Sequence, residues 1–431
     1  MRVGLVIGTR PEAIKMAPVV RELRARAASG LESIVIATGQ HQDLVWPILD
    51  FFEIRPDHEL KSVRKGRSLN LLFANIIAEL DSLLPKLNLD LLLVQGDTTS
   101  AAAAAHAAFH RRIKVAHVEA GLRTGRLDAP WPEEWYRRTI ALSSSFHFAP
   151  TRSARNNLLR EGFPAESILV TGNTVIDALL SATARLKADR SLMAALDAKF
   201  ACLDAAENIV LVTLHRRENF GQGIRGVCRA LTTLAQPSGV SIVLPVHPNP
   251  NVQEQVRGAL EGRKNIHLIP PAGYVEFVYL MNRCRLILTD SGGVQEEAPS
   301  LGKPVLVLRN STERREGVSA GAAELVGTDP DRIVTAARSI LERHERSPPQ
   351  RLTNPFGDGR AAERIAEFIA SANWMASAGM RGERMPSVPI AMGKGTRPQR
   401  VPLQLLARRS LRPEARVEGF RVGSGEGAGR A

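Results

Sequence analysis

The sequence predicts an α/β protein with two doubly wound parallel-sheet, Rossmann-like domains, one after the other along the chain. Short runs of valine, isoleucine and leucine alternate with helical stretches, which is typical of parallel strands that helices cover on both faces. This pattern stops near residue 173 and starts again near residue 208. The 431 residues are enough for two domains of ordinary size. We therefore expect a binding crevice where the carboxyl ends of the two sets of strands face each other.

The first domain is expected over residues 1–173. Its strand candidates are the apolar runs at residues 3–8, 33–39, 89–96, 113–121 and 146–151. Helix candidates lie between these runs, among them Glu12 to Ala27 and Ala101 to His110.

The second domain is expected over residues 208–357, after a helical connection at residues 174–207. Its strand candidates are residues 208–215, 240–247, 265–270, 285–290 and 303–309. A closing helix is predicted at residues 358–376, followed by a basic tail at residues 377–431.

The net charge of +13 is concentrated in the tail, because residues 375–431 hold ten Arg and one Lys against four Glu. The remaining +6 is modest for 374 residues, so we expect no nucleic-acid partner. The composition of the tail predicts a disordered segment without function, with nonspecific RNA or membrane contact as the alternative. The chain has no run of 18 apolar residues and no signal-peptide pattern, and its three cysteines are isolated. A cytoplasmic protein without a membrane partner is expected.

Unusual polar residues follow the predicted strands, at the sheet edge where α/β proteins bind ligands. Asp97 and Glu119 each end an apolar run, Glu133 lies in the following loop, and His215 ends the first strand of the second domain. Each has a simpler interpretation: Asp97 as a helix cap, Glu119 in a structural salt bridge, His215 as a core histidine. Together, three carboxylates and a histidine are groups suited to proton transfer. No metal-ligand pattern accompanies them.

Cations and glycines at the same edges predict an anion site. Arg10 and Lys15 flank the first helix, and Arg314 follows the last strand candidate. The segment Ser291, Gly292 and Gly293 opens a helix whose backbone N–H groups can bind phosphate oxygens. Glu297, one turn further, suits a ribose diol. Neither GxGxxG nor a Walker motif is present, so the dinucleotide and P-loop binding modes are not supported. The anion site together with a ribose contact predicts a nucleoside diphosphate derivative as ligand.

The motifs "GTRPEAIKMAPV", "QGDTTS", "HVEAGLRTG", "PWPEE", "TGNTVIDALL", "HRRENFG", "PVHPNPNV", "LTDSGGVQEEAPSLGKPVLVLR" and "STER" occur in this order. In them, residues 1–374 resemble the bacterial non-hydrolysing UDP-N-acetylglucosamine 2-epimerases. The resemblance implies the glycosyltransferase-B fold, a homodimer and a UDP-sugar substrate. It also implies reversible C2 epimerisation of UDP-GlcNAc to UDP-ManNAc through 2-acetamidoglucal, without NAD or metal, to supply ManNAc-type sugars for cell-surface polysaccharide.

Site roles also follow from the resemblance, motif by motif. It implies Asp97, Glu119 and Glu133 as catalytic carboxylates and His215 as the active-site histidine. For the substrate, it implies that Glu297 contacts the ribose and that Phe277 contacts the uracil. It implies a diphosphate site made by Arg10, Lys15, Ser291, Gly292, Gly293 and Arg314. Which carboxylate removes the proton and which returns it stays open.

Four positions depart from the family pattern: Tyr136 before Arg137, Arg315 after Arg314, Ala272 near the base, and Leu214 before His215. Because these positions surround the sugar and its supports, the sugar preference stays open. The alternatives are the same epimerisation of a modified UDP-sugar, such as UDP-2,3-diacetamido-glucuronate, and a hydrolysing relative that releases ManNAc and UDP. A glycosyltransferase of the same fold is the alternative from another class.

Overall fold

The computed structural model describes residues 1–61, 68–203, 207–236, 239–346 and 354–371. These residues belong to one compact unit, Met1–Arg381. The predicted tail at residues 377–431 lies outside the described residues, as does the end of the predicted closing helix.

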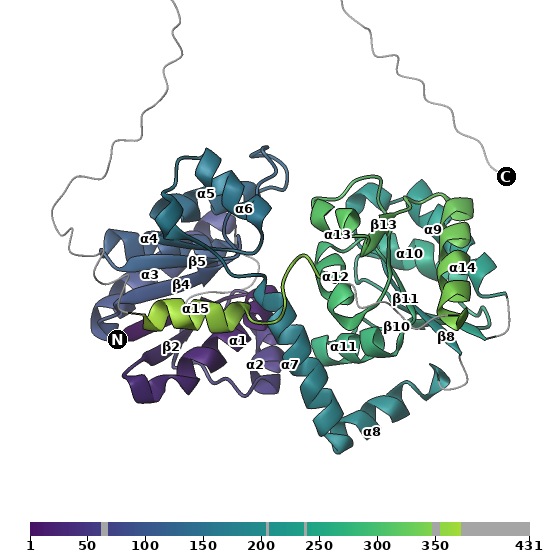
Figure 1. Ribbon diagram of the computed structural model, residues 1–431, viewed down its shortest axis with the longest axis horizontal. Coiled ribbons are helices and arrows are strands. Elements are labelled where there is room, and N and C mark those ends of the chain that lie inside the picture. Colours follow the sequence, from purple (N-terminus) through teal and green to yellow (C-terminus); the bar gives the residue numbers. More distant parts are fainter. Residues whose placement is uncertain (62–67, 204–206, 237–238, 347–353, 372–431) are drawn as a thin grey trace, which may run out of the picture. The chain divides into compact units, whose positions relative to one another are not determined.

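The first sheet has seven strands in the order β3-β2-β1-β4-β5-β6-β7, and all its strand pairs are parallel (Figure 1). Its strands are β1 (Arg2–Ile7), β2 (Glu32–Ala37), β3 (His58–Glu59), β4 (Leu91–Gln95), β5 (Lys114–Val118), β6 (Phe146–Ala149) and β7 (Ile168–Val170). The helices between them are α1 (Arg10–Ala25), α2 (Gln42–Phe51), α3 (Leu69–Leu87), α4 (Thr99–His110), α5 (Glu133–Ser143) and α6 (Arg152–Arg160).

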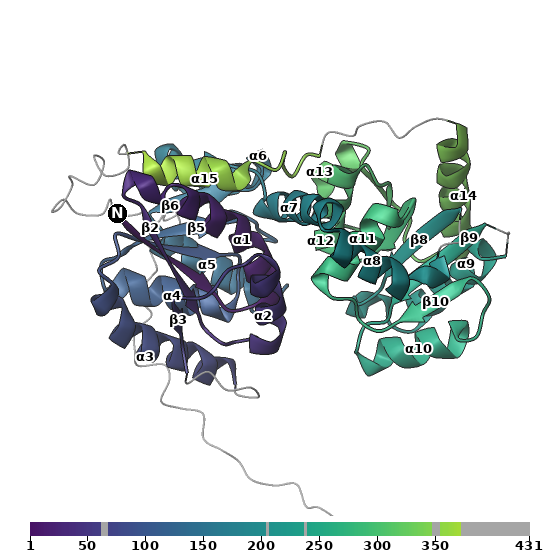
Figure 2. The ribbon, with the colours of Figure 1, turned by 90° about the horizontal axis from the view of Figure 1, so that it is seen from below.

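Both faces of this sheet are buried, which explains why its strands are apolar at nearly every position. Side chains of a strand alternate between faces, so Leu5 packs in the core that contains α1, whereas Val6 packs in the core beneath α3 and α4. Figure 2 shows α1 and α3 on opposite sides of the sheet. The strands thus end in loops between two helical layers.

The second sheet has six parallel strands in the order β10-β9-β8-β11-β12-β13. Two helices precede it, α7 (Thr174–Ala188) and α8 (Arg190–Lys199). Its strands are β8 (Asn208–Thr213), β9 (Val240–Pro245), β10 (Ile266–Ile269), β11 (Leu286–Thr289), β12 (Val305–Val307) and β13 (Ala323–Leu325). Its helices are α9 (Gln222–Leu234), α10 (Pro250–Leu260), α11 (Tyr274–Arg283), α12 (Gly292–Glu297), α13 (Arg315–Ser319) and α14 (Pro330–Arg346).

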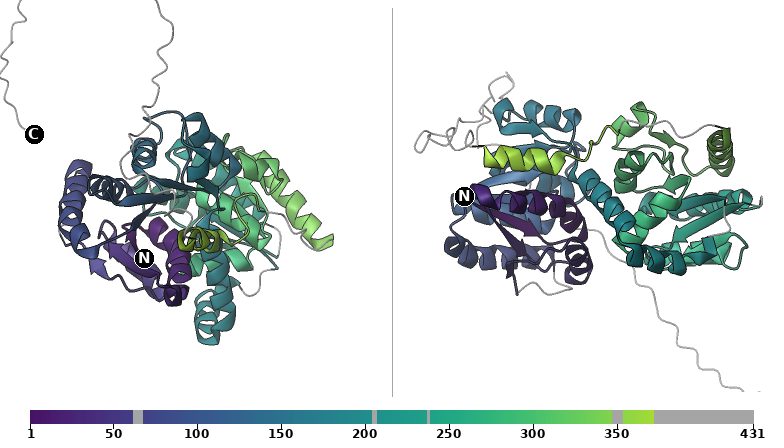
Figure 3. Two further views of the ribbon diagram at one scale, coloured as in Figure 1. Left: turned by 60° about the vertical axis from the view of Figure 1, so that its left-hand side comes forward. Right: turned by 60° about the horizontal axis from the view of Figure 1, so that its bottom comes forward.

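The last described helix, α15 (Ala361–Ala370), packs against α1 and α7 (Figures 1 and 3). Its backbone is fixed there because Asp177 Oδ1 accepts a hydrogen bond of 2.8 Å from the N–H of Ala362. The segment before α15 lies beside the segment that connects the first sheet to α7. There the N–H of Asn173 donates to the carbonyl of Phe356 at 2.8 Å. The helix predicted at residues 358–376 begins at Ala361, three residues later than predicted.

The predicted fold class is confirmed, with two parallel-sheet α/β arrangements. The ten predicted strands are all present, usually one or two residues shorter at their ends. The strands β3, β7 and β13 were not predicted, because two or three residues are too few to show a pattern. The predicted domain boundaries stay predictions. Within the described ranges, none of the helices combines the length and hydrophobicity that spanning a membrane requires.

Candidate active site

The first edge, defined as the C-terminal ends of β1, β4 and β5 with the residues that follow them, holds Glu119 in a buried ion pair. Lys15 Nζ lies 2.6 and 2.7 Å from the two carboxylate oxygens of Glu119, and Gln95 Nε2 donates a further hydrogen bond. Burial acts to raise the pKa of Glu119, but the charge and hydrogen bonds of Lys15 outweigh it and the pKa lies below its ordinary value. Glu119 also has a φ of 65°, a conformation that non-glycine residues adopt uncommonly.

Asp97 follows β4 and is held by Arg137 from α5. Arg137 Nε donates to Asp97 Oδ2 at 2.7 Å, and another guanidinium nitrogen lies 2.7 Å from the same oxygen. The N-cap of α4 is Thr98, whose hydroxyl accepts the N–H of Ala101 at 3.0 Å. The interpretation of Asp97 as a helix cap is therefore wrong. Its carboxylate is bound to Arg137 instead.

Glu133 and Glu134 open α5 but differ in their surroundings. Glu134 is fully buried and accepts N–H groups of Thr124 and Gly125 at 3.1 and 3.3 Å, besides Arg137 at 3.2 Å. Glu133 Oε2 is buried without a hydrogen-bond partner among the described residues. Glu134 thus holds the preceding loop in place, whereas the carboxylate of Glu133 keeps its bonding capacity for another group.

The second edge, defined as the C-terminal ends of β8 and β11 with the residues that follow them, is organised by the buried Asp290. Its carboxylate accepts backbone N–H groups of His215 at 3.0 Å and Arg216 at 2.9 Å, and an Asn219 amide hydrogen at 3.1 Å. His215 Nδ1 lies 2.9 Å from Asp290 Oδ1. The imidazole is half-buried, so the core-histidine interpretation is wrong. The contact at Nδ1 leaves Nε2 to meet a ligand.

The Ser-Gly-Gly segment, residues 291–293, lies at the start of α12. The N–H of Ser291 donates to Thr289 Oγ1 at 2.9 Å, so this N–H group is not free for phosphate as the sequence suggested. A Cβ atom on Gly292 would lie 2.9 Å from Arg314 Cζ. Glycine therefore allows the guanidinium of Arg314 to lie directly on this turn, where its Nε donates to Glu296 Oε1 at 2.8 Å.

Glu297 is buried on α12. Burial, followed by the nearby charge of Glu296, raises the pKa of Glu297 to about 8. The charges of Lys15 and Arg10 act on it in the opposite direction. The predicted uracil contact, Phe277, lies on α11 and packs against the same core as its neighbours there. These contacts leave the predicted roles of Glu297 and Phe277 untested.

Residues of the two edges meet at Asn173, which precedes α7. Its Nδ2 donates to Glu119 Oε1 at 3.3 Å and to Glu296 Oε2 at 3.1 Å. Sequence reasoning identified neither Asn173 nor Gln95 as a site residue, and it used Asp290 and Glu296 only as parts of a motif. The signal available was that Asn173 lies in the motif "TGNTVIDALL", just before a predicted helical connection.

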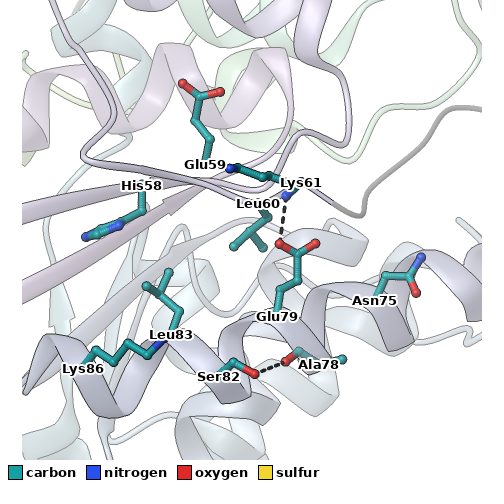
Figure 4. A pocket seen from close by; sticks show the side chains of 10 residues that line it. All are labelled: His58, Glu59, Leu60, Lys61, Asn75, Ala78, Glu79, Ser82, Leu83 and Lys86. Atoms are coloured by element: carbon teal, nitrogen blue, oxygen red, sulfur yellow. Dashed lines mark hydrogen bonds between the residues drawn. The ribbon is translucent and has the colours of Figure 1, made fainter.

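A hollow lies elsewhere, between β3 and α3 (Figure 4). It has a volume of about 550 Å³, and its lining residues include His58, Lys61 and Glu79, with the N–H of Lys61 donating to Glu79 at 2.8 Å. None of the predicted site residues lines it. Within the described part of the chain, no group of three or more His, Cys, Asp or Glu residues is arranged to hold a metal ion.

Comparison with known proteins gives one matching family model and three similar proteins. The family model described as UDP-N-acetylglucosamine 2-epimerase matches residues 22–370. A probable UDP-N-acetylglucosamine 2-epimerase of Ralstonia solanacearum is 48% identical over 370 residues, which is 85% of this chain and 98% of the relative. The enzyme of that name from Escherichia coli K12 is 47% identical over 371 residues, 86% and 98% of the two chains. A crystal structure of the Neisseria meningitidis UDP-GlcNAc 2-epimerase bound to UDP-GlcNAc is 44% identical, with a TM-score of 0.78 and coverage of 86% and 99%.

Proposed function

Because the chain belongs to the UDP-N-acetylglucosamine 2-epimerase family, we propose that it is an isomerase that interconverts UDP-GlcNAc and UDP-ManNAc. The observation that carries the proposal is the first edge. It places Asp97, Glu119 and Glu133 after neighbouring strands or at the start of α5, each with different partners. The solved relative from Neisseria meningitidis, which is bound to UDP-GlcNAc, supports the choice of substrate.

The reaction proposed is an elimination followed by an addition, without hydrolysis. A carboxylate removes the proton from C2 while the bond between C1 and the diphosphate oxygen breaks, with its electron pair leaving on UDP. The product is 2-acetamidoglucal, with a double bond between C1 and C2. An acid then returns a proton to the opposite face of C2, and the diphosphate oxygen bonds again to C1. The charge that develops as UDP leaves makes the C2 proton removable, so base and leaving-group stabilisation must act together.

The first edge supplies the groups for proton transfer. Glu119 is ionised near neutral pH, because its pKa lies below the ordinary value, so it meets the substrate as a base or an electrostatic partner. Lys15 is the closest cation to it and would move toward the diphosphate when substrate binds. Glu133 keeps a buried oxygen without a partner among the described residues, which suits direct contact with the sugar. The order in which the carboxylates act is not assigned.

The second edge supplies the groups that bind the leaving group. Arg314 carries a permanent positive charge at the Ser-Gly-Gly segment, and His215 is oriented by Asp290. Ser291 would contribute its hydroxyl, since its N–H group is bonded to Thr289. We propose that Arg10, Gly292 and Gly293 complete the diphosphate site, that Glu297 binds the ribose and that Phe277 lies near the uracil.

A homodimer is part of the proposal. Large apolar side chains are exposed along the first part of the chain, on α3, α4 and α5 and in the loop before α5; they include Leu71, Phe109, Trp131, Trp135 and Leu142. A second copy of the chain would cover such side chains. Light scattering coupled to gel filtration checks this point, and a monomer at micromolar concentration would contradict it.

One experiment tests the reaction and its alternatives. The protein is incubated with UDP-GlcNAc in D2O, and the products are followed by proton NMR. UDP-ManNAc with deuterium at C2 is expected, because the removed proton exchanges with solvent before return. Free ManNAc with UDP would instead identify a hydrolase. Absence of any C2 exchange, with transfer of the sugar to an added acceptor, would identify a glycosyltransferase.

A further inference from the structure

The side chain of Asn173 makes three contacts: with the start of α7, with Glu119 and with Glu296. It is 3% exposed and lies on the chain crossing from the first sheet to α7. Its Oδ1 accepts the N–H of Val175 at 3.1 Å and so caps α7. Its Nδ2 donates at 3.3 Å to Glu119 Oε1 and at 3.1 Å to Glu296 Oε2. A capping residue needs only the first of these contacts.

The two carboxylates that Asn173 contacts each bind a cation as well. Lys15 lies 2.6 Å from Glu119, and Arg314 lies 2.8 Å from Glu296. The five side chains thus form one continuous series, Lys15, Glu119, Asn173, Glu296 and Arg314, with two positive and two negative charges. Without the amide, two buried carboxylates would lie next to each other with no donor between them, an arrangement that disfavours ionisation of both.

We propose that Asn173 is a positioning residue that joins the proton-transfer carboxylate Glu119 to the diphosphate-binding residue Arg314 through Glu296. The inference rests on the proposed function and deepens it. When the diphosphate draws Lys15 and Arg314 toward itself, the carboxylates lose part of their cationic partners. The amide of Asn173 is neutral and keeps its hydrogen bonds, so Glu119 keeps its orientation at the step in which UDP leaves.

The groups around Glu119 define what a pH measurement reports. Lys15 comes from α1, Arg137 from α5, and Arg314 and Glu296 from the residues after the second sheet's strands, while His117 lies on β5. Gln95 is a neutral donor to the same carboxylate. Since an added N–H donor stabilises the ionised form, removal of the Asn173 amide should raise the pKa of Glu119.

The experiment compares Asn173→Ser with Asn173→Ala. Serine caps a helix about as well as asparagine but lacks the amide, whereas alanine lacks both functions. Asp189→Ala is the matched control, because Asp189 caps α8 through Ser191 and Leu192 and has no part in the site. The readouts are melting temperature, C2 exchange in D2O, and the pH dependence of kcat/KM. The pKa of Glu119 is measured without substrate by 13C NMR of labelled glutamate carboxyl groups, with the signal assigned by its loss in Glu119→Gln.

Asn173→Ser should melt close to the wild type yet lose kcat by about 10- to 100-fold, the size expected for a hydrogen bond to a charged group. Its acidic limb of kcat/KM should move to higher pH, together with the Glu119 pKa. Asp189→Ala should lower only the melting temperature. Wild-type kcat and an unchanged Glu119 pKa in Asn173→Ser would overturn the inference and leave capping as the only role.

Two further points keep the test decisive. If Asn173→Ser does not fold, Asn173→Thr keeps a capping oxygen while lacking the amide hydrogens, and the same readouts apply. If the wild type does not epimerise UDP-GlcNAc, the proposed function fails, but the NMR titration still reads the contact between Asn173 and Glu119. An unchanged pKa in both variants overturns the inference in that case as well.

Discussion

The two edges hold their acidic groups in different ways. At the first edge, Glu119 and Asp97 are bound by the long side chains of Lys15 and Arg137. At the second edge, Asp290 is bound by backbone N–H groups of His215 and Arg216. A side-chain cation can move to a new partner, whereas a backbone N–H group is fixed by the strand that precedes it. The comparison suggests that the first edge changes partners during the reaction, whereas the backbone around Asp290 stays rigid.

The largest expected effect comes from the first edge. Replacement of Asp97, Glu119 or Glu133 by its amide should lower kcat by about 10² to 10⁴ each, the range for acid–base catalysis, because an amide cannot transfer the proton. UDP affinity should change much less. The measurement is C2 exchange in D2O together with UDP titration calorimetry. Glu22→Gln, at a carboxylate on α1 that bonds Arg26, is the control. Native exchange rates in all three amide variants would contradict the assignment.

Removal of a cation from the diphosphate site should weaken UDP binding as well as lower turnover. Arg10→Ala or Arg314→Ala should weaken UDP binding by about 1.5–3 kcal/mol, since each removes a hydrogen-bonding charge. Titration calorimetry with UDP measures the change. Arg315→Ala is the matched control, because Arg315 is an exposed arginine next to Arg314. If all three variants bind UDP equally well, the diphosphate lies elsewhere.

A smaller effect tests the rigidity of the second edge. Gly292→Ala should weaken UDP binding by about 1 kcal/mol, because its Cβ would lie 2.9 Å from Arg314 Cζ and displace the guanidinium. The same substitution in an Arg314→Ala background should have little effect, since the displaced group is then absent. An undiminished loss in the double variant would mean that Gly292 itself meets the ligand.

The last prediction concerns pH and stability rather than catalysis or binding. The pKa of Glu297 is raised by burial to about 8, from an ordinary value near 4.5. Between these values the folded state binds the proton that the unfolded state has lost, so Glu297 lowers stability progressively as pH rises. Glu297→Gln should therefore raise the melting temperature at pH 8 more than at pH 5. Glu276→Gln, at a carboxylate on the neighbouring α11, serves as control. An equal shift at both pH values would contradict the raised pKa.

Strand ends were the places where the sequence alone could point to candidate site residues. Glu119 and His215 were recognised because a charged or titratable group directly after an apolar strand is visible in a linear pattern. Asn173 was not, because its contacts with Glu119 and Glu296 join residues 54 and 123 positions away. The sequence analysis mentioned Arg137 only as the residue after Tyr136 and gave it no role, although it binds Asp97. Contacts of this kind depend on how the elements pack, which local sequence does not encode.

The position of the last helix has a consequence for how the chain is made. Ile365 and Ile369 of α15 belong to the same core as Val20 and Leu23 of α1. During synthesis, a growing chain leaves the ribosome with α1 first, and the helix that covers it comes only after the entire second sheet. The first sheet thus cannot reach its final buried state until the chain has been synthesised as far as α15. A stop codon before Ala361 would yield a product with an uncovered apolar surface, prone to association with other unfinished chains.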